Sequence, residues 1–334
     1  MSAAPRTSSG AANPPEAQSA VADWPDGVIE DYEYDSLNRL DKLTQYAPDA
    51  TPEDLSDNDK IAESDYTVRA DGRRSSVTET HWYDDNADGV PDPHVVQTDW
   101  TYDDAGRLVD EAFDHFDDLL DQTGHFTYDL VGNRLEQTVD KGSDGSIEET
   151  TTYGYDANDC LTTESADTDG DTVTDRTTTY GYDHTQQTSK DVTESGQTTT
   201  ATAFTYDLQG RMETATITSY TAGVESRVEK TTYDYNSRGI RVSALHEVDT
   251  DANGTFETRT KTEFLNDPRN HTGYSQVLRE THSNADTSLV TKRVDYTIGH
   301  DEIAQMTTEY DPQGTVTNEE TLVFEQHKGD ILLY

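Results

Sequence analysis

The sequence predicts an all-β protein made of stacked antiparallel β-hairpins. Three observations predict it: an aromatic-rich motif recurs along the chain, strand-favouring Thr and Val surround its copies, and no window carries the apolar stripe of an amphipathic helix. A single hairpin is only marginally stable in water, so each copy must pack against its neighbours. Such an array is elongated or spiral, and its stability is a sum over adjacent repeats.

The recurring motif reads aromatic, any residue, Tyr, Asp, two residues and Gly, followed by Arg and an apolar residue. Its copies include WTYDDAGRL from Trp100 and FTYDLQGRM from Phe204, and a weaker copy, YTVRADGRR, begins at Tyr66. The Tyr positions of the copies, with Val68 in the weaker one, lie 24 to 34 residues apart. A looser echo of the motif surrounds Tyr310.

Each copy has the properties of a strand, a tight turn and a second strand. Residues two apart lie on the same face of a strand, so the two aromatic positions form a pair on one side. Asp begins the turn because its carboxylate accepts hydrogen bonds from the N–H groups that follow, and Gly supplies a positive φ. Arg is expected to pair with neighbouring carboxylates. The expected repeat-forming residues are Tyr34, Asp35, Tyr102, Asp103, Gly106, Arg107, Tyr128, Asp129, Gly132, Tyr155, Asp156, Tyr182, Asp183, Tyr206, Asp207, Gly210, Arg211, Tyr235 and Gly239.

The composition suggests three segments. Residues 1–26 are rich in Pro, Ala and Ser and are expected to be disordered, residues 27–260 carry the repeat array, and residues 261–334 carry degenerate repeats. The net charge of -44, from 68 acidic and 24 basic residues, repels nucleic-acid phosphates and anionic lipids, so neither is an expected partner. It also favours a medium in which salt or divalent cations screen the repulsion. No apolar run is long enough to span a membrane, and no export signal is visible.

Acidic loops between the repeats form a second pattern. DDNADGVPD from Asp84, DTDGDTVTD from Asp167 and DTDANGTFE from Asp249 carry acidic or amide residues at positions 1, 3, 5 and 9, and DKGSDGSIE from Asp140 keeps three of these. The spacing is that of the first nine positions of an EF-hand calcium loop. The expected ligands are Asp84, Asn86, Asp88, Asp92, Asp167, Asp169, Asp171, Asp175, Asp249, Asp251, Asn253 and Glu257.

These loops also have an explanation without metal. Position 12, where an EF-hand has a bidentate Glu, is Val95, Thr151, Thr178 or Thr260, so calcium affinity would be weak, roughly 0.1–1 mM. Asp, Asn and Gly are in addition the residues that hairpin tips require. Hairpin tips are therefore the preferred interpretation, with no obligatory cofactor and weak calcium binding as the alternative.

The sequence argues against an intrinsic active site. No HExxH, GxSxG, GxGxxG or phosphate-loop pattern is present, and abundant carboxylates make chance acidic pairs common. Cys160, the single cysteine, reads as an incidental small residue. The chain is therefore not expected to be an enzyme.

The motif resembles the YD repeat of the RHS, wall-associated and teneurin-like proteins, over about residues 28–334. The resemblance implies a spiral, partly closed, shell-like sheet that belongs to an exported contact-dependent toxin or a wall-associated protein. The segment YTIGHDEIAQM from Tyr296 looks like the approach to the RHS core, and we expect this core and a C-terminal domain to be missing from the chain.

Two functions follow from this resemblance. In the first, the chain is a non-catalytic scaffold, a shell or surface segment that is secreted or displayed on the cell, with a C-terminal toxin as cargo in the full-length family. In the second, the array is a carbohydrate-binding adhesin that holds glycans or another cell-surface partner, with weak calcium-binding loops. The regular spacing of the aromatic residues favours the first, because packing requires such spacing.

Overall fold

The computed structural model describes residues 18–23, 28–47, 55, 58–269, 274–298 and 302–323. It divides into two compact units. The first contains residues 1–153 and 166–174, and the second contains residues 154–165 and 175–334. The predicted change from regular to degenerate repeats after residue 260 lies within a strand of the second unit, and this change stays a prediction.

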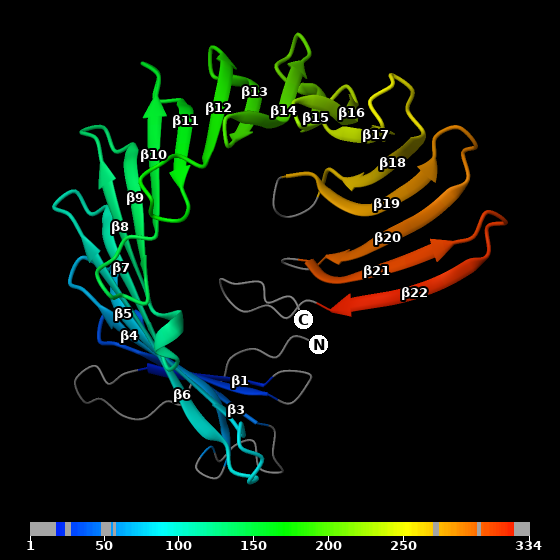
Figure 1. Ribbon diagram of the computed structural model, residues 1–334. Helices are drawn as coiled ribbons and strands as arrows, with labels where there is room; N and C mark the ends of the chain where they lie inside the picture. The colour runs from blue at the N-terminus through cyan, green and yellow to red at the C-terminus, as the bar shows by residue number, and fades with distance from the viewer. Residues whose placement is uncertain are drawn as a thin grey trace. The chain divides into compact units, whose positions relative to one another are not determined.

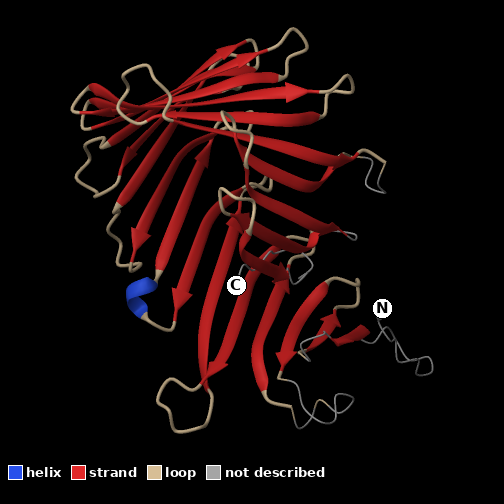
Figure 2. Ribbon diagram, turned by 90° about the vertical axis from the view of Figure 1, so that its right-hand side faces the viewer, coloured by secondary structure: helices blue, strands red, loops and turns tan. Residues whose placement is uncertain are grey.

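Nearly all regular secondary structure in the described part of the chain is β-strand, as the sequence predicted, and Figure 2 shows a single helical turn there, η1 (Asp118–Leu120). The first unit contains β1 (Gln18–Asp23), β2 (Ile29–Tyr34), β3 (Leu40–Tyr46), β4 (Lys60–Val68), β5 (Arg74–Tyr83), β6 (Asp92–Tyr102), β7 (Leu108–His115), β8 (Gln122–Tyr128), β9 (Arg134–Lys141) and most of β10 (Glu149–Tyr155). Each of these strands pairs antiparallel with the next (Figure 1).

The second unit repeats this arrangement. It contains most of β11 (Leu161–Asp167), then β12 (Arg176–Asp183), β13 (Gln186–Glu194), β14 (Gln197–Tyr206), β15 (Met212–Thr221), β16 (Val224–Tyr235), β17 (Arg241–Asp249), β18 (Thr258–Asp267), β19 (Gln276–Asn284), β20 (Val290–Ile298), β21 (Glu302–Tyr310) and β22 (Val316–Val323). From β12 to β22 every strand pairs antiparallel with its successor (Figure 1). The predicted class of stacked antiparallel hairpins is therefore confirmed.

β1 lies inside the segment that composition predicted to be disordered. Its six residues pair antiparallel with β2, from Gln18 opposite Tyr34 to Asp23 opposite Ile29. An edge strand presents a row of unpaired N–H and C=O groups, and the run QSAVAD contains no Pro or Gly that would prevent pairing with it. Composition alone does not detect this kind of pairing.

The buried residues are mainly small β-branched side chains. Val77, Val96, Val139 and Phe126 are buried in the first unit, while Val248 and Val294 are buried in the second. Threonines join them, including Thr44 and Thr308, each 2% exposed. The repeat tyrosines Tyr34, Tyr102, Tyr128, Tyr155, Tyr182, Tyr206 and Tyr235 are half-buried. Their rings therefore add apolar area at the edge of this thin core.

A β-bulge marks the second aromatic position of the repeat. The strand register shifts at Tyr34, Val68, Tyr102, Tyr128, Tyr182, Tyr206, Tyr235, Asn266, Ile298 and Tyr310. In the hairpin of Tyr102, for example, Thr101 pairs with Asp110 and Tyr102 with Leu108, which leaves Val109 as the extra residue of the following strand. Bulges increase local twist. Asn266 and Ile298 thus occupy the Tyr position of two repeats that the sequence pattern did not identify.

Candidate functional site

The turn of the repeat is a short loop held by the backbone and by one carboxylate. In the copy at Tyr102, the Asp103 N–H donates to the Arg107 carbonyl (3.0 Å) and the Gly106 N–H donates to the Asp103 carbonyl (2.9 Å). The Arg107 N–H also donates to Asp103 Oδ1 (2.8 Å). Gly106 has a φ of 79°, in the left-handed region that favours glycine. This is a type I turn followed by a residue with positive φ, a common hairpin loop.

The same backbone forms where glycine is absent. Asn38 and Asp159 replace the glycine in the copies at Tyr34 and Tyr155, and each has a φ of 60°. Asn and Asp tolerate this region better than other side chains do. Asp183 departs from the expected role, because it stays in β12 opposite Gln186 and the loop shortens to two residues.

The arginine of the motif joins one repeat to the next. The Arg107 Nε donates to Asp103 Oδ2 within its own turn (2.7 Å), while Arg107 NH1 donates to the Asp129 carbonyl of the next turn (2.7 Å). The Arg107 guanidinium also lies 4.8 Å from the centroid of the Tyr128 ring. In the second unit, Arg211 likewise pairs with Asp207 and lies 4.7 Å from the Tyr235 ring. Cation–π contacts of this kind stabilise by about 0.5–1 kcal/mol at exposed sites.

The tyrosine hydroxyl supplies a second link between repeats. Tyr235 Oη donates to the Met212 carbonyl (2.9 Å), and Tyr206 Oη donates to the Gln187 carbonyl (2.7 Å). Tyr102 Oη donates to the Arg74 carbonyl (2.9 Å) in the first unit. The characteristic residues of the motif are thus engaged with the preceding or following hairpin, and we call this set of contacts the Tyr–Arg–Asp ladder.

Electrostatics stabilises the ionised form of the turn carboxylates. Hydrogen bonds from the Arg39 side chain lower the pKa of Asp35, and those from Arg211 lower the pKa of Asp207. The Arg107 backbone N–H, followed by its side chain, lowers the pKa of Asp103. These carboxylates are therefore held as anions inside the turns that they close.

Cys160 occupies the arginine position of its repeat. Its N–H donates to Asp156 Oδ1 (3.0 Å), as the arginine N–H does in other copies. Burial, and then the nearby carboxylates of Asp156 and Asp159, raise the pKa of the Cys160 thiol. A raised pKa lowers the thiolate fraction, on which nucleophilic reactivity depends.

The four acidic loops share one hydrogen-bonding pattern. The N–H at position 6 donates to the position 1 carboxylate in each loop, at 2.7 to 2.8 Å, from Gly89, Gly145, Thr172 and Gly254. Positions 4 and 6 have positive φ in all four, although position 4 is Ala, Ser or Gly and position 6 is Gly or Thr. The N–H at position 7 donates to the side chain at position 5, from Val90, Ser146, Val173 and Thr255. Different sequences have converged on one loop conformation.

The loop from Asp249 collects its acidic side chains most completely within one unit. Asp249, Asp251 and Glu257 each place one carboxylate oxygen within 4.8 Å of the others. Asp249 is only 2% exposed. Burial alone would raise its pKa, but hydrogen bonds from the N–H groups of Gly254, Asp251 and Asn253 hold the pKa below its usual value. Calcium takes oxygen ligands at 2.3–2.6 Å, so such a spacing suits ligands on opposite sides of one ion.

The predicted ligands of the first and third loops also take part in hydrogen bonds. In the first loop, Asn86 Nδ2 donates to Asp92 Oδ2 (2.8 Å), so positions 3 and 9 bond to each other. Asp167, Asp169 and Asp171 of the third loop accept N–H groups of their own loop, as Asp249 and Asp251 do in theirs. Asp175, the fourth predicted ligand of the third loop, belongs to the second unit. Within the second unit, the structure brings together Asp249, Asp251 and Glu257 from the predicted ligands.

Comparisons with known proteins give structural likenesses only. No protein-family profile and no curated protein sequence matches the chain. The crystal structure of TcdB2-TccC3-Cdc42 aligns with a TM-score of 0.49 and 12% identity, over 94% of this chain and 18% of that one. The crystal structure of TcdB2-TccC3-TEV aligns with a TM-score of 0.38 and 10% identity, over 92% and 20%. A porin-like protein from Bacteroides uniformis aligns with a TM-score of 0.32 and 13% identity, over 77% and 99%.

This chain therefore spans about a fifth of the first two of these chains. Membership of the YD-repeat family stays a prediction from the motif. Within the described residues, no helix is long and apolar enough to cross a lipid bilayer.

Proposed function

We propose that the chain is a non-catalytic scaffold, a shell or surface segment of an exported contact-dependent toxin or wall-associated protein. The observation that carries this proposal is the Tyr–Arg–Asp ladder. The residues that recur most regularly are those whose side chains bond to a neighbouring hairpin, as Arg107 does with Asp129 and Tyr235 with Met212. The residues that recur in each repeat are thus residues that hold neighbouring hairpins together.

The charge supports an external location for such a scaffold. A net charge of -44 keeps the chain soluble, and its self-repulsion weakens where salt or divalent cations are abundant. The motif adds the resemblance to exported YD-repeat proteins. The proposal includes a toxic C-terminal domain as cargo, because the proteins that the motif resembles combine a repeat shell with such a domain.

Protease accessibility on intact cells tests the location. A tagged full-length protein in its own host is expected to be digested by added protease without lysis, while a cytoplasmic marker survives. Full protection of the tagged chain, with digestion only after lysis, would contradict an exported scaffold. Co-purification of a polypeptide encoded downstream in the same frame would in turn support cargo.

A second candidate function, calcium binding, is favoured by the loop from Asp249. Its three carboxylates lie close together, and its N–H groups already orient Asp249. With a dissociation constant of about 1 mM, 10 mM calcium would stabilise the second unit by about 1.4 kcal/mol. The predicted glycan partner stays a prediction, which a glycan array read with and without chelator would test.

Calorimetric titration with calcium chloride tests this candidate. Asp251→Asn is isosteric and is expected to weaken calcium binding in this loop severalfold. Asp183→Asn changes the charge equally at an exposed position outside the loops, so it should leave binding unchanged. Equal calcium binding by wild type and Asp251→Asn would eliminate the site.

A further inference from the structure

One interruption of the ladder in the second unit lies between β16–β17 and β18. We define the Arg211 junction as Asp207, Arg211 and Tyr235, and the Ile240 junction as the equivalent residues of the next repeat, Asn236, Ile240 and Asn266. The equivalence follows from hydrogen bonds. The Ile240 N–H donates to Asn236 Oδ1 (3.1 Å), as the Arg211 N–H does to Asp207 Oδ1 (3.0 Å).

Asn266 stands at the position of a repeat tyrosine. The register shift at Asn266 matches the one at Tyr235. Asn266 Nδ2 donates to the Arg241 carbonyl (2.9 Å), and Arg241 follows Ile240 as Met212, the acceptor for the Tyr235 hydroxyl, follows Arg211. The Asn266 amide thus donates the hydrogen bond that a tyrosine hydroxyl donates in the preceding repeat, but Asn266 has no ring.

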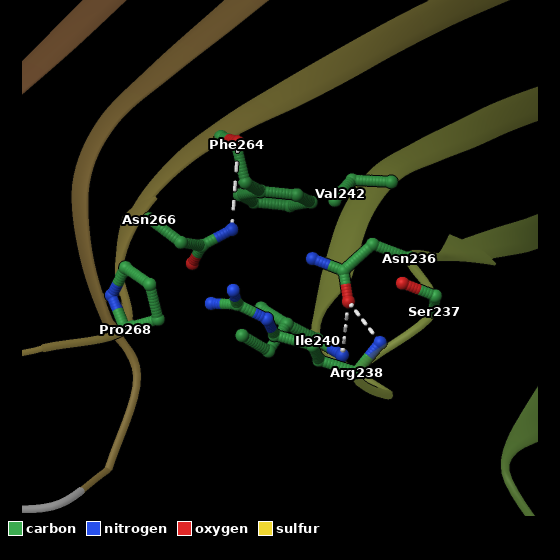
Figure 3. A pocket seen from close by; sticks show the side chains of 8 residues that line it. All are labelled: Asn236, Ser237, Arg238, Ile240, Val242, Phe264, Asn266 and Pro268. Atoms are coloured by element: carbon green, nitrogen blue, oxygen red, sulfur yellow. Dashed lines mark hydrogen bonds between the residues drawn. The ribbon is translucent and has the colours of Figure 1, made fainter.

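The missing ring and guanidinium leave a hollow. Its volume is about 240 Å³, and Figure 3 shows it between the turn after β16 and the end of β18. Phe264, Ile240 and Val242 form its apolar part, and Asn236, Arg238 and Asn266 contribute polar groups. None of the lining residues is acidic.

The hollow presents unused hydrogen-bond donors. Within the described part of the chain, the Arg238 guanidinium has no ion-pair partner, although acidic residues outnumber basic ones by 68 to 24. Its side chain reaches across the hollow toward Asn266 and Pro268 (Figure 3). The Asn236 amide group also faces the hollow, and its oxygen already accepts the N–H groups of Arg238 and Ile240 (Figure 3). A cation and an amide N–H₂ therefore face the same space.

We propose that this hollow binds a small aromatic carboxylate. The ring of the ligand occupies the space of the missing tyrosine ring, between Phe264 and the Arg238 guanidinium, where stacking and cation–π contact are both available. The carboxylate accepts hydrogen bonds from Arg238 and Asn236, and guanidinium–carboxylate pairing is strong and directional. A dry cavity of about 150 Å³ accommodates benzene, so 240 Å³ has room for a ring and its carboxylate-bearing substituent.

Ligand-observed NMR titration of the full chain tests the proposal with N-acetyl-tyrosine and N-acetyl-tyrosinamide. The acid is expected to bind saturably and about tenfold more tightly than the amide, the factor that one charge-assisted hydrogen bond supplies. Arg238→Gln should reduce the affinity for the acid to that for the amide. Arg176→Gln, an equal change of charge at another exposed arginine of the second unit, should leave both affinities unchanged.

A variant that fills the hollow tests whether the probes bind there. Asn266→Tyr restores the ring of the repeat and is expected to abolish binding of both probes, and an unchanged or higher urea midpoint would show that the variant is folded. Equal affinity of wild type for acid and amide, undiminished binding by Asn266→Tyr, or absence of saturable binding would each overturn the proposal. The test does not depend on export, so it can fail while the scaffold function stands.

Discussion

The Arg211 and Ile240 junctions share one backbone and differ in side chains. The turn hydrogen bonds are nearly identical, with Asp207 N to the Arg211 carbonyl and Asn236 N to the Ile240 carbonyl both at 2.9 Å. Gly210 and Gly239 have φ values of 74° and 78°. The turn therefore forms with or without the ion pair, because the backbone hydrogen bonds and a residue with positive φ determine it. The contacts between neighbouring repeats come from the ring, through Arg211 with the Tyr235 ring and the Tyr235 hydroxyl with Met212.

The largest difference between the two junctions should lie at the tyrosine position. Tyr235→Ala removes a half-buried ring, its hydroxyl bond to Met212 and its contact with Arg211, so we expect a loss of about 3 kcal/mol in the free energy of unfolding. Asn266→Ala removes mainly one hydrogen bond and should cost about 1 kcal/mol. Urea unfolding followed by tyrosine fluorescence measures both. Equal losses would show that the ladder contributes nothing beyond backbone pairing.

Arg211 and Arg238, the arginines in the turns of the two junctions, should show a smaller contrast. Arg211→Gln removes a partly exposed ion pair and a cation–π contact, which predicts a loss of about 1 kcal/mol. Arg238→Gln removes an arginine that has no ion-pair partner among the described residues, and it should change the free energy of unfolding by less than about 0.5 kcal/mol. The urea midpoints of the two variants measure these losses. A larger loss in Arg238→Gln than in Arg211→Gln would show that Arg238, and not Arg211, stabilises the array.

Rebuilding the ladder should stabilise the second unit. The triple variant Asn236→Asp, Ile240→Arg, Asn266→Tyr recreates the Arg211 junction one repeat later, and we expect a gain of about 1 kcal/mol from the new ion pair and ring. Thermal unfolding by circular dichroism would record it as a higher midpoint. A lower midpoint would mean that the surroundings of the Ile240 junction no longer accept a ring.

Acid should weaken the Arg211 junction selectively. The pKa of Asp207 is lowered in the folded protein, so its contribution to stability is fully present above the unfolded value near 3.9 and is lost as the pH falls through the lower, folded pKa. The urea midpoint should therefore fall between pH 5 and pH 2, and the fall should be smaller in Asp207→Asn. An identical pH profile for the variant would exclude this carboxylate as a source of the acid sensitivity.

The local part of each repeat was predictable from sequence. The positions of Asp103, Gly106 and Arg107 within five residues predict a hairpin turn, and the turn forms with the expected bonds. The degenerate copies at Asn266 and Ile298 were missed because neither carries the tyrosine that defined the pattern. Their bulges are visible only in the strand register.

Sequence also predicted the acidic loops but not which of them collects its ligands. All four loops share the position 1 to position 6 bond, which depends on contacts within a few residues. In the first loop, Asn86 bonds to Asp92, whereas Asp249, Asp251 and Glu257 converge. The direction of a side chain depends on its neighbours in space, which the motif does not encode.

By itself, the sequence determined the all-β class, the hairpin unit and its turn, because each depends on contacts within a few residues. The tertiary structure alone decided which arginine meets which ring, and it showed that a missing pair leaves a hollow beside Phe264. The ladder bonds described above join residues 19 to 28 positions apart, such as Tyr206 with Gln187 and Tyr102 with Arg74. Their meeting depends on strand register, which bulges shift and a linear motif cannot specify.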